Sequence, residues 1–211
     1  MKLLFCSDPL NDRQVDPEYE MEYNMAKELS IPVELVSLES LLEGNSSKAI
    51  KRIPTSESQE TVIYRGWMMK PAYYEQLYNA LTIKNLFLIN SPEAYVYGHY
   101  FPNSYEVIQA ATPLSIWLDI ESLHEGLEPI HEKLNVFGSR PIIIKDYVKS
   151  RKHEWEEACY IPDASDKHQV QYVVGNLIER QGEELSGGVV FREYIELEHL
   201  SKHPKSGMPL E

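Results

Sequence analysis

A cluster of five basic residues stands out in a chain that is otherwise strongly acidic. The cluster occupies nine positions and consists of Lys145, Lys149, Arg151, Lys152 and His153. The whole chain has 33 acidic and 20 basic residues, and its formal net charge is -13 at pH 7. Lys145 ends a run of three isoleucines, and an ammonium group at the end of a buried strand normally meets an anion. The sequence therefore predicts a pocket for a small anion at Lys145.

The other basic residues of the cluster have two interpretations. Three glutamates lie close to them, between residues 154 and 157, and a mixed run of charges is usually a solvated hairpin tip with screened ion pairs. We interpret Lys149 and Lys152, taken singly, as surface residues of that kind, and Lys145 as functional. Arg65 also ends an apolar strand. It is either a ligand contact at the carboxyl end of that strand or one half of an ion pair between domains.

Several common sites are excluded by residue spacing. The chain has no GxxxxGK[ST] phosphate loop, no GxGxxG after its first strand, no HExxH and no GxSxG. His199 and His203 are four residues apart, but the surrounding Ser, Gly and Pro favour a loop, so we interpret them as surface histidines. No metal site is predicted within these residues. Cys6 and Cys159 are predicted to be buried, reduced thiols.

Composition and charge limit the class of protein further. With 43% hydrophobic and 25% charged residues, the composition is that of an ordinary globular protein. The net negative charge disfavours extended binding to nucleic acid or to anionic membranes. The apolar run at the N-terminus is too short for a signal peptide, and no apolar stretch is long enough to span a membrane. We therefore expect a soluble, cytoplasmic protein, whose oligomeric state is left open.

The first part of the chain, residues 1–97, alternates between strands and helices. Its apolar runs predict strands at 2–8, 32–37, 61–66 and 86–90. This alternation predicts a mostly parallel sheet with helices on both faces, and such sheets bind ligands at the carboxyl ends of their strands.

Two segments of this first domain are predicted in more detail. Met21, Met25 and Leu29 lie at helical spacing and give the first helix an apolar face. Residues 45–60 are polar and are predicted to form a mobile connection.

The second part of the chain, residues 98–211, has a different order of elements. The predicted elements are a strand at 141–148, a basic loop, a strand at 156–161, a helix at 168–181 and a long strand from 188. Asp166 is the expected N-cap of the helix. The two strands around the loop are expected to pair, which predicts an antiparallel α+β sheet covered by one helix.

This order of elements, together with four sequence motifs, resembles the ATP-grasp superfamily. The motifs are YRGWMMKP, HYFPNSY, IKDYVKSRKHEWEEACYIP and GGVVFREYIELE. They look like a little-characterised, phage-associated clade of predicted ATP-dependent ligases. The resemblance implies that residues 1–97 are a pre-ATP-grasp-like domain and that residues 98–211 are an ATP-grasp nucleotide-binding subdomain.

The resemblance also implies roles for individual residues. Lys145 would be the phosphate lysine, and the loop with Lys149, Arg151, Lys152 and His153 would cover the phosphates. The backbone of Glu193, Tyr194 and Ile195 would read adenine, and Glu196 or Glu198 would accept hydrogen bonds from the ribose. Arg192 lies on the face opposite Glu193. It could contact phosphate or an acidic substrate, or it could form a structural salt bridge. The weakest assignments are the substrate contacts, Tyr64, Arg65 and Lys70.

Two features of the chain depart from the superfamily pattern. The cover loop has no glycine, so side chains must replace close backbone contacts to phosphate. The strands that carry the magnesium ligands in this superfamily are expected beyond residue 211.

The activity that the resemblance implies is carbon–nitrogen ligation. It would use ATP and Mg, and its substrate would be a small-molecule or peptide carboxylate that is activated as an acyl phosphate and then captured by an amine or similar nucleophile. A nucleotide-binding module without catalysis is the first alternative. A protein that binds single-stranded nucleic acid is the second, because Tyr147 and Trp155 flank the basic cluster and could stack on bases.

Overall fold

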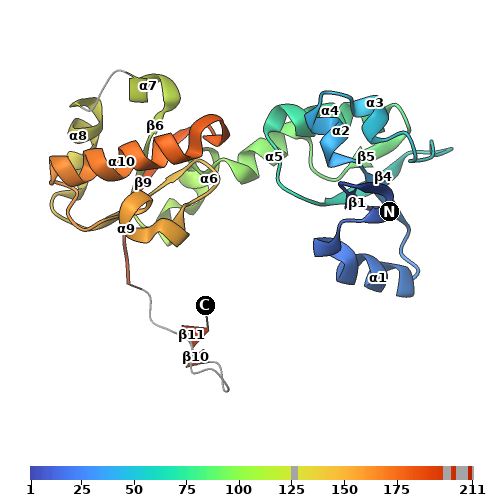
Figure 1. Cartoon of the computed structure of the whole chain (residues 1–211), viewed down its shortest axis with the longest axis horizontal. Coiled ribbons are helices and arrows are strands. Elements are labelled where there is room, and N and C mark those ends of the chain that lie inside the picture. The colour runs from blue at the N-terminus through green and yellow to red at the C-terminus, as the bar shows by residue number, and fades with distance from the viewer. Residues whose placement is uncertain (125–127, 197–200, 203–208, 211) are drawn as a thin grey trace. The chain divides into compact units, whose positions relative to one another are not determined.

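The computed structural model of the chain describes residues 1–124, 128–196, 201–202 and 209–210 (Figure 1). The chain divides into two compact units, Met1–Gly98 and His99–Glu211. Each unit is built around its own sheet and its own hydrophobic core. None of the described helices is both long enough and apolar enough to cross a membrane.

The first unit contains a mostly parallel sheet. Its elements are β1 (Lys2–Asp8), β2 (Asn11–Val15), α1 (Glu20–Glu28), β3 (Val33–Val36), α2 (Leu38–Leu42), α3 (Ser46–Ala49), β4 (Glu60–Arg65), α4 (Pro71–Thr82), β5 (Leu86–Leu88) and α5 (Pro92–His99). β1 pairs with β3 and β4 in parallel, β4 pairs with β5 in parallel, and β2 runs antiparallel to β1. The predicted parallel sheet is therefore confirmed, with one added hairpin strand.

Helices α2, α3 and α4 enclose the main core of this unit. The segment 45–60 was predicted to be a mobile connection, and this is wrong for its first half. Asn45 caps α3 by accepting a hydrogen bond from the Lys48 backbone N–H at 2.9 Å, and Ile50 and Ile53 are buried in the core. The segment is ordered because these apolar side chains are removed from water against α4 and the sheet.

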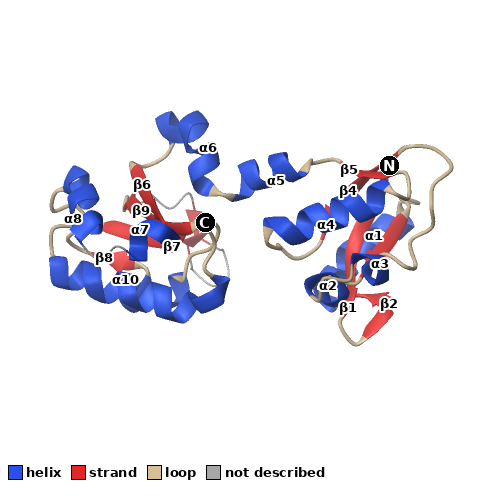
Figure 2. Cartoon of the chain, turned by 90° about the horizontal axis from the view of Figure 1, so that it is seen from above, coloured by secondary structure: helices blue, strands red, loops and turns tan. Residues whose placement is uncertain are grey.

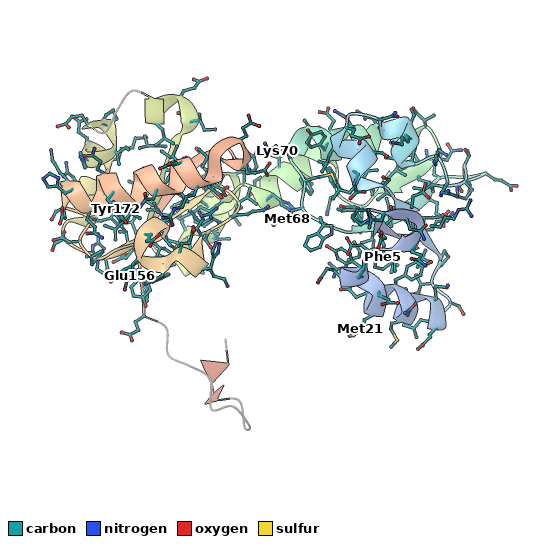
Figure 3. All side chains as sticks on the ribbon, in the orientation of Figure 1. Phe5, Met21, Met68, Lys70, Glu156 and Tyr172 are labelled. Atoms are coloured by element: carbon teal, nitrogen blue, oxygen red, sulfur yellow. The ribbon has the colours of Figure 1, made fainter. Side chains whose placement is uncertain are left out.

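Helix α1 has the predicted apolar stripe, but most of this stripe faces solvent. Ala26 is the buried residue of α1, whereas the Met21 side chain is 86% exposed and projects away from the sheet (Figure 3). Met25 and Leu29 are also exposed. These three side chains and β1 residues Leu3 and Phe5 line an open apolar groove.

The second unit contains a four-stranded antiparallel sheet in the order β6-β9-β7-β8. Its elements are α6 (Phe101–Ile108), β6 (Ser115–Asp119), α7 (Ile120–His124), α8 (Glu128–Leu134), β7 (Ile142–Asp146), α9 (Trp155–Ala158), β8 (Tyr160–Ile161), α10 (Lys167–Gln181), β9 (Gly188–Glu193), β10 (Ser201–Lys202) and β11 (Pro209–Leu210). The predicted fold class, a mostly parallel sheet followed by an antiparallel α+β unit, is confirmed.

The two faces of this antiparallel sheet have different coverings, and Figure 2 shows α10 on one side of the sheet and α6 on the other. Asp166 caps α10 as predicted, because its carboxylate accepts hydrogen bonds from the N–H groups of His168 and Gln169. The buried side of α10 packs on the sheet through four apolar residues, Val170, Val173, Val174 and Leu177. Tyr172, on the other side of the helix, is exposed (Figure 3).

Candidate functional site

Strand register places a set of polar and apolar side chains on the face of the antiparallel sheet that α10 does not cover. Ile143 pairs with Arg192 on one side and with Tyr160 on the other, and Lys145 pairs with Val190. Paired residues in an antiparallel sheet lie on the same face, and residues two apart along a strand share that face. We call the surface formed by Ile143, Lys145, Tyr160 and Arg192 the Lys145 face.

Two cationic groups lie near one aromatic ring at this face. The Lys145 Nζ is 6.0 Å from the centroid of the Phe101 ring, and the Arg192 Cζ is 5.6 Å from it. The Lys145 ammonium donates a hydrogen bond to the Val148 carbonyl at 2.9 Å, and the Arg192 guanidinium donates to the Thr112 hydroxyl at 2.7 Å. In the part of the chain that the structure describes, neither cation forms a salt bridge with a carboxylate.

The electrostatics of these two groups favour an anionic ligand. Burial lowers the pKa of Lys145, the nearby Asp146 carboxylate partly opposes this shift, and the Arg192 charge adds to it. Burial also lowers the pKa of Arg192. Two neighbouring, partly desolvated cations without a carboxylate partner repel each other. An anion between them would relieve this repulsion and restore charge-assisted hydrogen bonds.

The loop that follows Lys145, residues 147–154, is ordered by side chains. Asp146 is fully buried, and its carboxylate accepts hydrogen bonds from the backbone N–H groups of Val148 and Lys149. Arg151 forms an ion pair with Glu154, and Glu154 in turn contacts Arg180 of α10 at 3.1 Å. The loop therefore turns sharply without a glycine.

The five residues of the predicted basic cluster do not act as one group. Arg151 points to Glu154 and to the end of α10, and the His153 Nε2 lies 3.9 Å from the same glutamate. The Lys149 and Lys152 side chains are exposed, and the described residues offer their ammonium groups no hydrogen bond or ion pair. Lys145 alone of the five lies on the Lys145 face, together with Arg192.

The end of β9 carries the predicted adenine-reading segment. The Glu193 N–H donates to the Leu114 carbonyl at 2.8 Å, and the Tyr194 N–H donates to the Pro141 carbonyl at 2.9 Å. The Glu193 carboxylate forms a salt bridge with Arg140 at 2.7 Å. Ile195 is 49% exposed, and Glu196 is also exposed.

Glu198, the second candidate for the ribose, lies outside the described residues. Its role stays a prediction.

An aromatic cluster next to this segment was not predicted from the sequence. The Trp155 ring stacks on Tyr160 with centroids 5.1 Å apart, and Tyr194 makes edge contacts to both rings. Trp155 is therefore held by partners within the unit. Tyr147 has an edge contact to Tyr100. Ile143 and Lys145 are two residues apart on β7, so the sequence could have indicated that they share a face of the sheet. The sequence could not indicate that Tyr160 lies on the same face, because this depends on the register of β8 against β7.

The three predicted substrate contacts lie in the first unit. Arg65 forms two hydrogen bonds to the Glu22 carboxylate, at 2.7 and 2.5 Å, so its ion pair lies within the unit and does not join two domains. The Tyr64 hydroxyl donates to the Trp67 carbonyl at 2.7 Å and lies 3.2 Å from the Cys6 sulfur. Burial raises the pKa of the Tyr64 hydroxyl.

Successive residues of a strand point to opposite faces, so Tyr64 and Arg65 are not brought together. Lys70 immediately precedes α4 and is exposed (Figure 3).

Among the described residues, no group of three or more His, Cys, Asp or Glu side chains could hold a metal ion.

Comparisons with known proteins agree with this architecture. Residues 134–210, which include β7, the loop, α10 and β9, match the family model of the ATP-grasp domain, R2K clade family 3. This part of the chain is therefore similar to an ATP-grasp domain. The predicted resemblance to this superfamily is thereby confirmed. No curated protein sequence matches the chain.

Solved structures of ATP-grasp type share the fold at low sequence identity. A RimK domain protein from Sphaerobacter thermophilus is 13% identical, with a TM-score of 0.53 over 94% of this chain and 66% of that one. D-alanyl-alanine synthetase A from Vibrio cholerae is 10% identical, with a TM-score of 0.51 over 93% and 60%. N5-carboxyaminoimidazole synthetase from Staphylococcus aureus, solved with ADP, is 9% identical, with a TM-score of 0.51 over 97% and 50%. The chain thus spans between half and two thirds of the length of these proteins.

Proposed function

We propose that the chain binds ATP on the Lys145 face and belongs to an ATP-dependent carboxylate–amine ligase. The observation that carries this proposal is the pair of neighbouring cations, Lys145 and Arg192, which share one sheet face with apolar Ile143 and have no carboxylate partner in the described chain. Arg192 pairs with Ile143, but its guanidinium and the Lys145 ammonium both lie within 6.0 Å of the Phe101 ring centroid. The face thus offers a cationic region beside an apolar side chain, which matches the phosphates and the base of a nucleotide.

The phosphate end of the proposed site lies at the end of β7. The Lys145 ammonium has three N–H donors, so it would keep its hydrogen bond to the Val148 carbonyl and donate another to a phosphate oxygen. Arg192 would supply a planar guanidinium to the same anion. Lys149 and Lys152 are exposed on the loop and would add charge. Arg151 already has a carboxylate partner, so we assign it to holding the loop.

The base end lies next to Ile143. In the described chain the N–H groups of Glu193 and Tyr194 are already bonded to sheet carbonyls, which leaves the Ile195 N–H as the donor to adenine. Glu193 is paired with Arg140, so its backbone carbonyl, rather than its carboxylate, would contact the base. Glu196 or Glu198 would contact the ribose.

The two units would have different tasks. Residues 98–211 would bind the nucleotide, and the pre-ATP-grasp-like domain, residues 1–97, would contribute to the carboxylate substrate through the exposed Arg65 and Lys70. Tyr64 is left out of this proposal, because it lies on the face opposite Arg65 and its hydroxyl is bonded to the Trp67 carbonyl. For Arg65 this requires the Glu22 ion pair to open or to share the guanidinium.

The proposed reaction has two steps. A carboxylate oxygen of the substrate attacks the terminal phosphorus of ATP, the bond from that phosphorus to the bridging oxygen breaks, and ADP leaves behind an acyl phosphate. An amine nitrogen then attacks the acyl carbon, loses a proton and expels inorganic phosphate. Lys145 and Arg192 would offset the charge of the transferred phosphoryl group in the first step.

Magnesium is expected in such a reaction, but the described residues do not include a carboxylate cluster that fits it. No step is therefore assigned to the metal. Ligands beyond residue 211, a cytoplasmic location and an association with phage stay predictions.

Calorimetric titration tests the proposed binding. ATP should bind to the wild-type chain in the presence of Mg²⁺ more tightly than either tripolyphosphate or adenosine alone, because both ends of the face would then be occupied. Absence of heat with ATP at millimolar concentration would contradict the proposal.

ATP binding without turnover in the presence of carboxylates and amines would support the non-catalytic alternative. Tight binding of oligothymidylate, which lacks adenine, would instead favour the nucleic-acid alternative.

A further inference from the structure

Gln181, the last residue of α10, links two parts of the segment that surrounds Lys145. Its Nε2 donates a hydrogen bond to the Asp146 Oδ2 at 2.9 Å, and its Oε1 accepts one from the Arg151 Nη1 at 3.1 Å. A carboxylate only accepts hydrogen bonds and a guanidinium only donates them. The two partners therefore fix the orientation of the amide between them.

A short series of contacts leads from Gln181 to the Lys145 ammonium. Gln181 holds one oxygen of the Asp146 carboxylate, while the other oxygen accepts the N–H groups of Val148 and Lys149. The turn made in this way brings the Val148 carbonyl within 2.9 Å of the Lys145 Nζ. The position of the ammonium group thus depends on a side chain from the end of α10.

Arg151, the second partner of Gln181, extends the link into the middle of the loop. Its Nη1 also approaches the Arg180 carbonyl at 3.4 Å, and its Nε contacts Glu154. The loop 147–154 contains no glycine. Side-chain contacts to the end of α10 therefore fix its path, where a glycine-rich loop would rely on free backbone amides.

We propose that Gln181 is a positioning residue for the nucleotide, which holds Asp146 and Arg151 so that Lys145 and the loop are placed for the phosphates. This inference rests on the proposed binding of ATP at the Lys145 face. Gln181 does not itself touch the nucleotide. It acts by preorganisation, because a loop that is already ordered loses less conformational entropy when the ligand binds.

A purely structural role for Gln181 would have a different signature. Gln181 is half-buried at the end of α10 and is not part of the core. The four residues that α10 contributes to the core lie nearer its N-terminus. Changing its amide is expected to lower the melting temperature, because the buried Asp146 carboxylate loses a donor. With a purely structural role the folded variant would bind ATP as the wild type does, whereas we expect its affinity for ATP to fall.

The test uses two nearly isosteric substitutions and their combination, each titrated with ATP by calorimetry. Gln181→Glu keeps the acceptor for Arg151 but places a carboxylate against Asp146, and we expect about tenfold weaker binding, which is about 1.4 kcal/mol. Asp146→Asn alone places two N–H donors against each other and should weaken binding similarly. The double variant reverses the direction of the hydrogen bond, keeps the acceptor for Val148 and Lys149, and should recover most of the affinity.

Two controls make the outcome decisive. Gln171→Glu changes the charge equally on an exposed position of the same helix and should leave ATP affinity within twofold. Lys145→Met tests the underlying site. If Lys145→Met abolishes binding but Gln181→Glu binds as the wild type does, or the double variant shows no recovery, the role of Gln181 is wrong and the ATP site stands. If Lys145→Met binds normally, both proposals fail.

Discussion

Replacing Lys145 with methionine should weaken ATP binding about a hundredfold. Methionine keeps an unbranched apolar stem of similar length, so the packing beside Phe101 should be retained. The charge and the hydrogen-bond donors are lost. A hydrogen bond to a charged group contributes about 1.5–3 kcal/mol, and a hundredfold change corresponds to about 2.7 kcal/mol. Calorimetric titration of the wild type and the variant under identical conditions measures the difference.

Lys167→Met is the matched control for this prediction. Lys167 is also a lysine of the second unit, but it is exposed at the start of α10, where it pairs with Glu128 at 3.5 Å. The substitution removes the same charge, so it accounts for any general effect of net charge on the binding of an anion. Its affinity for ATP should stay within twofold of the wild type. Equal losses in both variants would mean that Lys145 has no special position.

Replacing Gly188 with alanine should lower the free energy of unfolding by about 3 kcal/mol, at the upper end of overpacking effects. Gly188 begins β9 and lies directly against β6. A Cβ atom at this position would be 2.1 Å from the Leu118 carbonyl oxygen and 2.7 Å from the Asp119 Cα. Both are backbone atoms, so β6 and β9 would have to separate. Urea unfolding followed by circular dichroism measures the change.

Gly175→Ala is the control, and it should change the free energy of unfolding in the opposite direction. Gly175 lies within α10, and a Cβ atom there would meet nothing within 4 Å. Alanine favours the helix over glycine by about 0.5–1 kcal/mol, so this variant should be slightly more stable than the wild type. A Gly188→Ala variant as stable as the wild type would contradict the close approach of β6 to β9, and with it the register that pairs Ser115 with Arg192.

Local sequence patterns predicted much of the fold. The helix at 168–181 follows from its apolar spacing and from Asp166 as its cap, and the structure has α10 at Lys167–Gln181. A strand at 156–161 pairing with β7 across the basic loop was also predicted, but it is confirmed only for Tyr160–Ile161, because Trp155–Ala158 form α9. The helix and its cap depend on neighbours within a few residues, which the sequence displays directly.

Features that depend on distant partners were not predictable in the same way. Asn45 and two isoleucines order the segment after α2 because α4 and the sheet cover them, and nothing in the polar sequence around them indicates that cover. The exposed stripe of α1 is the converse case, since Met21 has the right spacing for burial but meets no covering element within its unit.

The candidate site shows the same division. Lys145 was predicted to end a buried strand, and the structure has it in β7, because its place after an isoleucine run is a local feature. Its role in binding an anion stays a prediction. The partners of Arg151 were not predicted, because Gln181 is 30 residues away and its contact depends on how α10 ends beside the loop. The aromatic contacts of Tyr160 and Tyr194 likewise require the register of three strands.

The most direct test of the central claim is where ATP protects the chain from hydrogen exchange. With saturating ATP, amide exchange should slow in the loop 147–154 and at residues 194–196, and it should stay unchanged in β1 and β4 of the first unit. This pattern would place the nucleotide on the Lys145 face. Protection confined to residues 1–98, or no protection at a concentration where ATP binding is saturated, would contradict it.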